Sequence, residues 1–301
     1  MRLARASIQL AFLAIVGQAA VTSAQRLPLD SVQARIARRV AEVKGAIVGV
    51  AFRDLQTGDT LYMNADDSFN TASTMKIPVL IELYRRADAK AFSLDQPIPL
   101  ANEFKSLVDG SPFTLVEGDD SDSAAYAMTG TRVPIRTLIE HMITRSSNLA
   151  TNTLIAFVGA KDTDSTAHAL GARNIHILRG VEDTKAVRAK LNNTTTARDL
   201  DVLMEAIETG RAASPVSTDS MRAVLLRQEF NGEIPAGLPA GVKVAHKTGW
   251  INGSLHDAAI VYPPGRKPYV LVLLTRGIPD QEVARKLMVD VSRLVYQHVN
   301  P

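Results

Sequence analysis

Residues 71–84 combine a serine and a lysine three positions apart with the start of a long apolar run. The apolar pattern after Lys76 predicts a helix packed into a core, and Pro78 fits because it falls in the first turn, where a missing N–H costs least. Residues i and i+3 share one face of a helix, so Ser73 and Lys76 are expected to converge. A desolvated lysine can accept the proton of a serine hydroxyl, which makes this pair a candidate nucleophile and base.

The Ser-x-x-Lys pair is weak alone, because chance gives about 0.7 such pairs in a chain of this composition. Two further motifs strengthen it. Ser146-x-Asn148 offers a hydroxyl and an amide between two predicted helices at 134–143 and 149–158. Lys247-Thr248-Gly249 ends a predicted strand, and Gly249 allows a ligand to approach the backbone closely. Together and in this order, the motifs are expected by chance about once in a hundred chains or less.

The arrangement of predicted elements indicates one α/β layer built from both ends of the chain. Strands are expected at 46–52, 61–63, 242–247, 258–262 and 269–274, with an amphipathic helix at 281–298. The first helix is expected at 32–40, capped by Asp30 or Ser31. The middle of the chain reads as short helices and loops, including a helix capped by the run Thr194-Thr195-Thr196, with Asp199 reaching back from its first turn. We therefore expect an α/β (α+β) fold with an antiparallel sheet flanked by N- and C-terminal helices and an inserted all-helical domain.

The N-terminus has the layout of a secretory signal peptide, with Arg2 and Arg5, an apolar segment at 8–16 and small residues before Ala24. We expect cleavage near Ala24, a periplasmic or secreted protein, and no membrane association afterwards. Domain bounds follow: a signal peptide at 1–24, a sheet domain at 25–71 and 215–301, and a helical domain at 72–214. Cleavage lowers the formal charge from +3 to +1, which argues against a nucleic-acid partner. The absence of cysteine excludes a disulfide framework.

At this point the chain resembles the class A β-lactamases, within the penicillin-recognising serine hydrolases, as a divergent member. The resemblance covers nearly the whole mature chain and implies a β-lactamase/transpeptidase-like fold. It implies hydrolysis of β-lactams through an acyl-enzyme without cofactor or metal, in a monomer that confers antibiotic resistance. The implied machinery consists of Ser73 as nucleophile, Lys76 as its proton partner, Ser146 as proton donor to the leaving nitrogen, and Glu182, 36 residues after Ser146, as activator of the deacylating water. Asn148, Lys247, Thr248 and Gly249 would bind the substrate, and the backbone N–H groups of Ser73 and Trp250 would form the oxyanion hole.

The sequence departs from the family pattern in four respects. Ser147 replaces the aspartate of the Ser-Asp-Asn motif, and Ala186 stands four residues after Glu182, where the family has an asparagine that holds water. The polar loop around Glu182, at 179–193, is about two residues short. No arginine clearly matches the one that supports the substrate carboxylate; His256 and Arg276 are the two candidates. Which of Lys76 and Glu182 starts acylation stays open.

Two alternatives to a β-lactamase remain. One is a related serine hydrolase, a D-Ala-D-Ala peptidase or esterase, that β-lactams acylate but that deacylates poorly. The other is an exported β-lactam-binding sensor domain. Metal chemistry is not expected, because no second His or Cys stands at ligand spacing from His246 or His256, which read as hydrogen-bonding strand residues. The Trp250 ring is expected to cover a hydrophobic edge or to play no part beyond its backbone.

Overall fold

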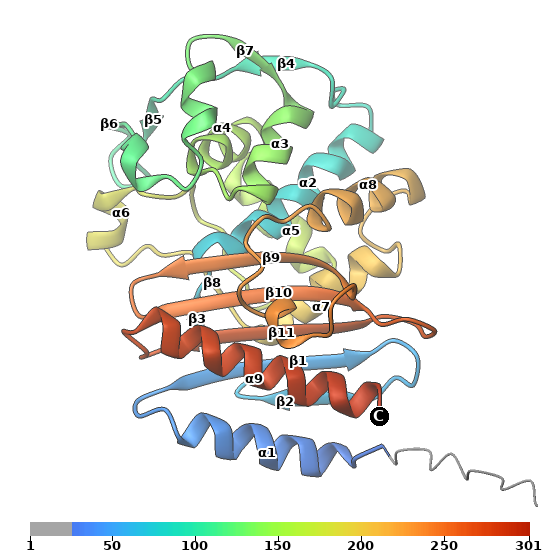
Figure 1. The fold of residues 1–301 in the computed structure, drawn as a ribbon. Coiled ribbons are helices and arrows are strands. Elements are labelled where there is room, and N and C mark those ends of the chain that lie inside the picture. The colour runs from blue at the N-terminus through green and yellow to red at the C-terminus, as the bar shows by residue number, and fades with distance from the viewer. Residues whose placement is uncertain (1–25) are drawn as a thin grey trace, which may run out of the picture.

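The computed structural model describes residues 26–301, so the expected signal peptide at 1–24 lies outside the described residues. A five-stranded antiparallel sheet occupies the lower half of the molecule (Figure 1). Its spatial order is β2-β1-β11-β10-β9. The strand bounds are β1 Ile47–Asp54, β2 Thr60–Met63, β9 Lys243–Ile251, β10 Ser254–Tyr262 and β11 Tyr269–Arg276. Strand β1 pairs with β11, with Ile47 opposite Arg276 at one end and Asp54 opposite Tyr269 at the other. This pairing joins segments from the two ends of the chain in one sheet and confirms the expected fold class.

Two helices, α1 (Leu29–Ala41) and α9 (Gln281–Val299), cover one face of the sheet (Figure 1). Both bury an apolar stripe against it, with Val32 and Ile36 contributed by α1. The expected cap of the first helix is wrong. Leu29 already begins the helix, and Asp30 lies inside its first turn, where a carboxylate interacts favourably with the helix dipole.

The helical half of the molecule lies against the opposite face of the sheet (Figure 1). Its helices are α2 Lys76–Asp88, α3 Ile135–Thr144, α4 Asn148–Val158, α5 Ala160–Ala169, α6 Thr184–Arg188, α7 Ala197–Glu208 and α8 Pro215–Leu225. Helix α7 packs directly on β1, β10 and β11. The side chain of Thr196 accepts from the backbone N–H of Asp199 at 3.0 Å, which confirms the predicted cap of this helix.

Short elements connect these layers. Three two-stranded pairs join β3 with β8, β4 with β7, and β5 with β6, and four 3₁₀ turns lie between the helices. The bounds of these elements are β3 Phe69–Asn70, β4 Pro97–Pro99, β5 Phe104–Lys105, β6 Pro112–Phe113, β7 Arg132–Pro134, β8 Thr194–Thr195, η1 Ala72–Met75, η2 Glu117–Asp119, η3 Ser123–Met128 and η4 Pro235–Gly237.

One hydrophobic cluster runs through both halves of the molecule, from Leu80 on α2 through Leu203 on α7 to Val272 on β11. Burial of these side chains, worth about 1.5–3 kcal/mol each, fixes the helices against the sheet. The domain boundaries at residues 72 and 214 stay a prediction, because the core is continuous across them.

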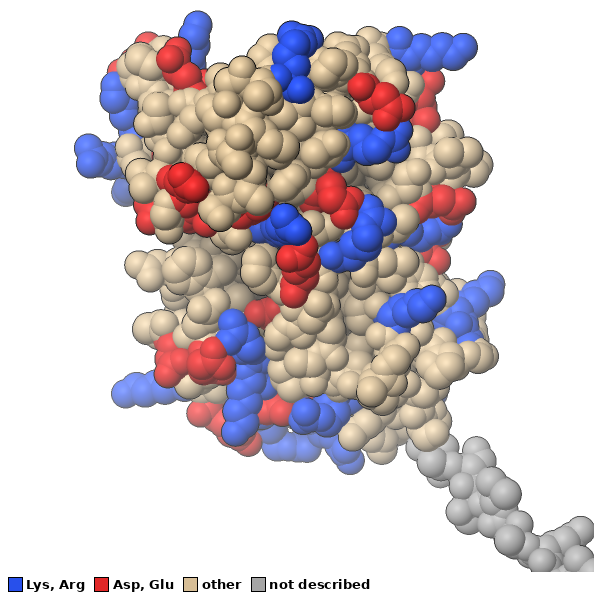
Figure 2. All heavy atoms as spheres, turned by 45° about the horizontal axis from the view of Figure 1, so that its top comes forward, with Lys and Arg blue, Asp and Glu red and all other residues tan. Residues whose placement is uncertain are grey.

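The surface shown in Figure 2 mixes acidic and basic side chains without a field of one sign. Among residues 26–301, no helix combines the length and the apolar character of a membrane span.

Candidate active site

Ser73 and Lys76 meet at the junction of the 3₁₀ turn η1 with helix α2, and not within one α-helix as expected. In a 3₁₀ turn the side chains at i and i+3 eclipse, which brings the two groups together. Lys76 Nζ lies 3.0 Å from Ser73 Oγ. Ala72, just before the serine, has a φ of 43°, and its N–H is held by Asn70 Oδ1 at 2.9 Å. This strained backbone sets the position of Ser73.

Lys76 is fully buried and surrounded by neutral oxygen atoms. Besides Ser73 Oγ, its Nζ lies 2.6 Å from Ser146 O, 3.0 Å from Ser146 Oγ and 3.0 Å from Asn148 Oδ1. Burial, and next the positive charge of Lys247, lower the pKa of Lys76 well below its usual value. A neutral amine in contact with Ser73 Oγ is suited to accept the serine proton.

Ser146 lies between the two lysines. Its Oγ is 3.0 Å from Lys76 Nζ and 3.1 Å from Lys247 Nζ. A hydroxyl oxygen has two acceptor sites, so donation from both lysines leaves its own proton free to be given to a third group. The φ of Ser146 is 60°, a rare conformation for this residue type, and it points the side chain between α2 and β9.

Strand β9 carries the third motif along the edge of the cleft. The Lys247 side chain is fully buried, and burial lowers its pKa to about 7. The backbone of Gly249 lies close to the backbone of Ser73, because a Cβ at position 249 would lie 3.0 Å from Ser73 N and 3.2 Å from Thr74 N. Trp250 follows with its ring 58% exposed, so the ring covers little of the protein.

A cavity of about 650 Å³ lies between these elements. It is lined by motif residues from the turn, the helix junction and the strand: Ser73, Ser146, Asn148, Thr248, Gly249 and Trp250. A small molecule with a carbonyl carbon placed at Ser73 fits a space of this size. The structure thus brings together residues that are up to 177 positions apart in the chain.

Glu182 is not part of the cavity lining but lies behind Asn148, whose Nδ2 donates to Glu182 Oε1 at 2.5 Å. Burial raises the pKa of Glu182 above its ordinary value, and the hydrogen bond from Asn148 opposes that rise. Glu182 has a φ of 62°. A half-buried carboxylate with a raised pKa is suited to accept a proton from water.

The loop that carries Glu182 is fastened at points that the sequence did not reveal. Asn152 on α4 binds Val181 twice, by donating to its carbonyl at 3.0 Å and accepting from its N–H at 2.6 Å. Gly180 is required beside it, because a Cβ there would lie 2.2 Å from Asn152 Oδ1. Asn193 closes the loop by accepting from the N–H groups of Leu178 and Arg179 at 2.8 and 3.2 Å. Ala186, at the position of the expected asparagine, is fully buried.

The carboxylate missing at Ser147 is supplied from another loop. Asp120 Oδ2 accepts from the N–H groups of Asn148 and Leu149 at 2.9 and 3.0 Å, at the N-terminus of α4. Ser147 itself caps the same helix by accepting from Ala150 N at 3.2 Å. Sequence reasoning missed Asp120 because it lies 28 residues from Asn148 in a polar, turn-rich stretch.

Neither candidate for the carboxylate-binding cation faces the cavity. His256 is fully buried; its Nε2 lies 2.9 Å from Asn70 O, and burial lowers its pKa to about 4, so the ring is neutral. The Arg276 guanidinium donates to Ser68 O at 2.6 Å and stacks on Phe69, outside the cavity lining. The geometry therefore supports neither assignment, and both stay predictions. The arginine that does line the cavity is Arg285, from α9.

His246 is a structural residue. Its Nδ1 lies 2.9 Å from Asp257 Oδ1, a fully buried partner, and its Nε2 lies 3.1 Å from Oδ1 of the exposed Asn231. The prediction that His246 and His256 are hydrogen-bonding strand residues is confirmed.

Comparison with known proteins gives the family. A family model described as the Beta-lactamase enzyme family matches residues 31–299. The chain belongs to this family. Beta-lactamase AST-1 of Nocardia asteroides is 30% identical over 265 residues, which is 85% of this chain and 81% of that protein. The carbapenem-hydrolyzing beta-lactamase KPC of Klebsiella oxytoca is 26% identical over 238 residues, 77% of each chain.

Solved structures give the same picture for this β-lactamase family member. The structure titled PBP-A superposes with a TM-score of 0.79 at 29% identity, covering 91% of this chain and 97% of its own. A beta-lactamase from Sphaerobacter thermophilus DSM 20745 gives a TM-score of 0.78 at 26% identity, covering 91% and 100%. With its three motifs in order, the chain is a divergent class A member.

Proposed function

We propose that this protein is a serine β-lactamase that hydrolyses the β-lactam amide through an acyl-enzyme on Ser73. The observation that carries the proposal is the contact between Asn148 and Glu182, because Asn148 also contacts Lys76, the partner of Ser73, and so links the carboxylate to the nucleophile. A carboxylate can accept a proton from the water that attacks an acylated serine, which is the step that allows turnover.

In the acylation step, Lys76 accepts the Ser73 proton while Ser73 Oγ bonds to the lactam carbonyl carbon. The developing oxyanion is stabilised by the N–H groups of Ser73 and Trp250, an effect of several kcal/mol in a site that excludes water. The C–N bond then breaks, and the lactam nitrogen takes a proton from Ser146, which Lys76 reprotonates. The contacts of Lys76 with both hydroxyls support this relay.

In the deacylation step, Glu182 removes a proton from a water that attacks the ester carbonyl. The C–O bond to Ser73 breaks, Ser73 takes the proton that Glu182 holds, and the ring-opened acid leaves. Lys247 and Thr248 bind the substrate carboxylate, and Asn148 binds its side-chain amide. Arg285 lines the cavity, and we assign to it the second positive charge in place of His256 or Arg276; its guanidinium also pairs with Glu233 and Glu282.

A second candidate function is a related serine hydrolase, or a β-lactam sensor, that is acylated but deacylates slowly. The buried Ala186 favours it, because a methyl group cannot help to hold the water. The similarity to PBP-A favours it as well.

Incubation of the mature protein with a chromogenic cephalosporin, followed by intact mass spectrometry, separates these functions. Steady turnover with a transient adduct supports the β-lactamase. A persistent adduct without turnover supports the slow-deacylating alternatives, and absence of any adduct rejects all of them. Ser73→Ala serves as the control that abolishes the adduct.

We also propose that the protein is exported after cleavage near Ala24 and acts as a monomer without nucleic-acid or membrane partners. Sequencing of the mature N-terminus in the periplasmic fraction, and the elution volume of the purified protein, test these points.

A further inference from the structure

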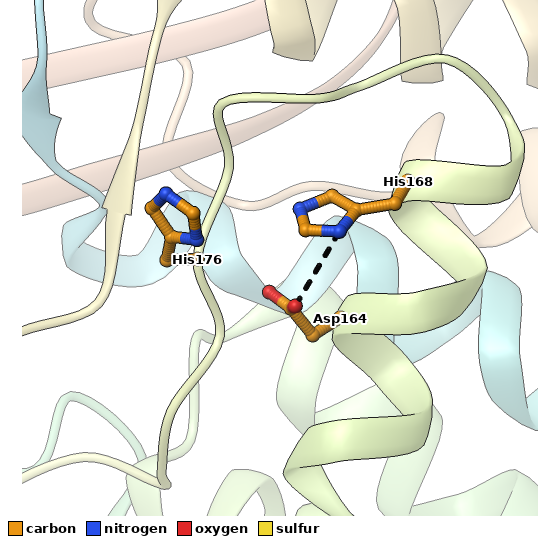
Figure 3. Close-up of side chains that lie close together, drawn as sticks. All are labelled: Asp164, His168 and His176. Carbon is orange, nitrogen blue, oxygen red and sulfur yellow. Dashed lines mark ion pairs between the residues drawn. The ribbon is translucent and has the colours of Figure 1, made fainter.

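Asp164, His168 and His176 form a cluster that has no part in the proposed hydrolysis (Figure 3). Asp164 and His168 lie one turn apart on α5, and His176 faces them from the segment that leads into the Glu182 loop. One ligand atom from each side chain lies within 4.8 Å of the other two. None of the three residues lines the 650 Å³ cavity.

The hydrogen bond of His168 fixes which of its ring nitrogens carries the proton and leaves the other nitrogen as an acceptor. Its Nε2 lies 2.7 Å from the carbonyl oxygen of Ile175, so Nε2 carries the proton of the neutral ring. The other nitrogen, Nδ1, then presents a lone pair to Asp164 Oδ2 at 3.6 Å. Two acceptors face each other there, and a cation between them resolves the conflict. Two ligands of a tetrahedral zinc ion are separated by about 3.3 Å, close to this distance.

The hydrogen bonds that hold the three side chains from behind match those found at metal sites. The carbonyl of Ile175 orients the His168 ring, in the way that metal-binding histidines are usually held. The other oxygen of Asp164, Oδ1, accepts from Ile177 N at 2.7 Å. His176 is fixed at its backbone by two hydrogen bonds with Thr194, at 2.8 and 3.0 Å, and its exposed ring packs edge-on against the His168 ring with the ring centres 5.9 Å apart.

We propose that Asp164, His168 and His176 bind one divalent transition-metal ion, with zinc as the best match to two imidazoles and one carboxylate. Three protein ligands leave the fourth position to water. His176 pairs with Thr194 just outside the two ends of the loop at 179–193, which carries Glu182. An ion bound by His176 and by the two α5 residues therefore joins helix α5 to the base of this loop. The site is a structural clamp, and it does not depend on the proposed hydrolysis. The competing description is a protonated His168 that forms an ion pair with Asp164 and requires no third partner.

The test is titration of tag-free mature protein with zinc chloride by calorimetry, in a buffer that does not chelate zinc. We expect one saturable zinc per chain and a rise in Tm of a few degrees at saturation. His176→Asn is the main variant, because its exposed side chain can be replaced without disturbing the fold. It should weaken zinc binding by at least about 100-fold and remove the rise in Tm. Asp164→Asn should weaken binding as well.

Asp162→Asn is the matched control, since it removes an exposed carboxylate from the same helix. It should bind zinc as the unaltered protein does. Cobalt(II) should give the intense visible bands of a four-coordinate site in the unaltered protein and in Asp162→Asn, but not in His176→Asn. Absence of saturable binding, or equal affinity in the unaltered protein and His176→Asn, would overturn the proposal. So would an equal loss in Asp162→Asn and Asp164→Asn.

Discussion

Asn148 donates its side-chain amide to Glu182 Oε1 across 2.5 Å, while its carbonyl oxygen accepts from Lys76 at 3.0 Å. One side chain at the start of α4 therefore orients both the carboxylate proposed for deacylation and the amine proposed for acylation. The orientation of the amide is fixed by its neighbours, because only its nitrogen can donate to a carboxylate and only its oxygen can accept from an amine. The two halves of the proposed reaction cycle are thus coupled through Asn148.

Replacement of Glu182 by Gln should trap the acyl-enzyme. The glutamine amide oxygen can still accept from Asn148, so the loop keeps its position, but it cannot accept a proton from water. Deacylation should slow by about 10²–10⁴-fold, and the ester should accumulate in the intact mass spectrum. Glu117→Gln, which changes an exposed loop glutamate, is the control. Unchanged turnover in Glu182→Gln would remove Glu182 from the mechanism.

The pH profile of kcat/KM should fall on the alkaline side because of Lys247. Burial lowers the pKa of this lysine to about 7, and a lysine is charged only below its pKa. The cation that binds the substrate carboxylate is therefore lost as the pH of the free enzyme rises above about 7. On the acid side, kcat/KM should fall only well below the ordinary lysine pKa, since Lys76 must be neutral and its pKa is lowered by burial and by Lys247.

Lys247→Arg provides the decisive comparison, because a guanidinium keeps its charge throughout this range. The alkaline limb of the profile should move to higher pH in this variant, although kcat itself can fall. Circular dichroism establishes that the variant is folded. An alkaline limb at the same pH in folded Lys247→Arg would show that another group controls it.

Asp120→Asn should destabilise the protein and disturb the site together. The carboxylate accepts two N–H groups at the positive end of α4, and an amide oxygen is a weaker acceptor there. We expect a loss of about 1–2 kcal/mol in the free energy of unfolding in urea. We also expect a fall in kcat/KM, because Asn148 begins this helix. Asp119→Asn, at the exposed neighbour, should stay within about 0.5 kcal/mol of the unaltered protein. Equal stability of the two variants would contradict the role given to Asp120.

The sequence was sufficient where the physical cause is local or periodic. Alternating and apolar runs predict β9, β10 and β11 in their order. The run Thr194-Thr195-Thr196 predicts a helix cap, and the structure shows that its last member provides it. The motif residues Ser73, Ser146 and Lys247 were predicted to share one cleft, and the structure does bring their side chains together through Lys76 and Ser146.

The features that the sequence did not reveal depend on contacts between distant segments. The carboxylate of Asp120 replaces the one expected at Ser147, and nothing local to either residue indicates this. The spacing of His256 from Lys247 suggested a binding role, but the adjacent strand and Asn70 enclose its ring. Arg285 reaches the cavity from the C-terminal helix, which only the packing of α9 against the sheet determines.

Gly249→Ala should impair the chemistry while leaving the substrate-binding side chains in place. A methyl group there would lie 3.0 Å from Ser73 N and 3.2 Å from Ala72 Cβ, and these are main-chain and strained neighbours that cannot rotate away. The turn η1 must shift, and the N–H group of Ser73 then moves from the place where the oxyanion forms. We expect kcat to fall by about 10²–10³-fold, the usual cost of losing one oxyanion donor. Gly118→Ala, which meets no atom within 4 Å, is the matched control and should keep its activity. Equal activity in the two variants would show that the close approach of β9 to Ser73 plays no part in catalysis.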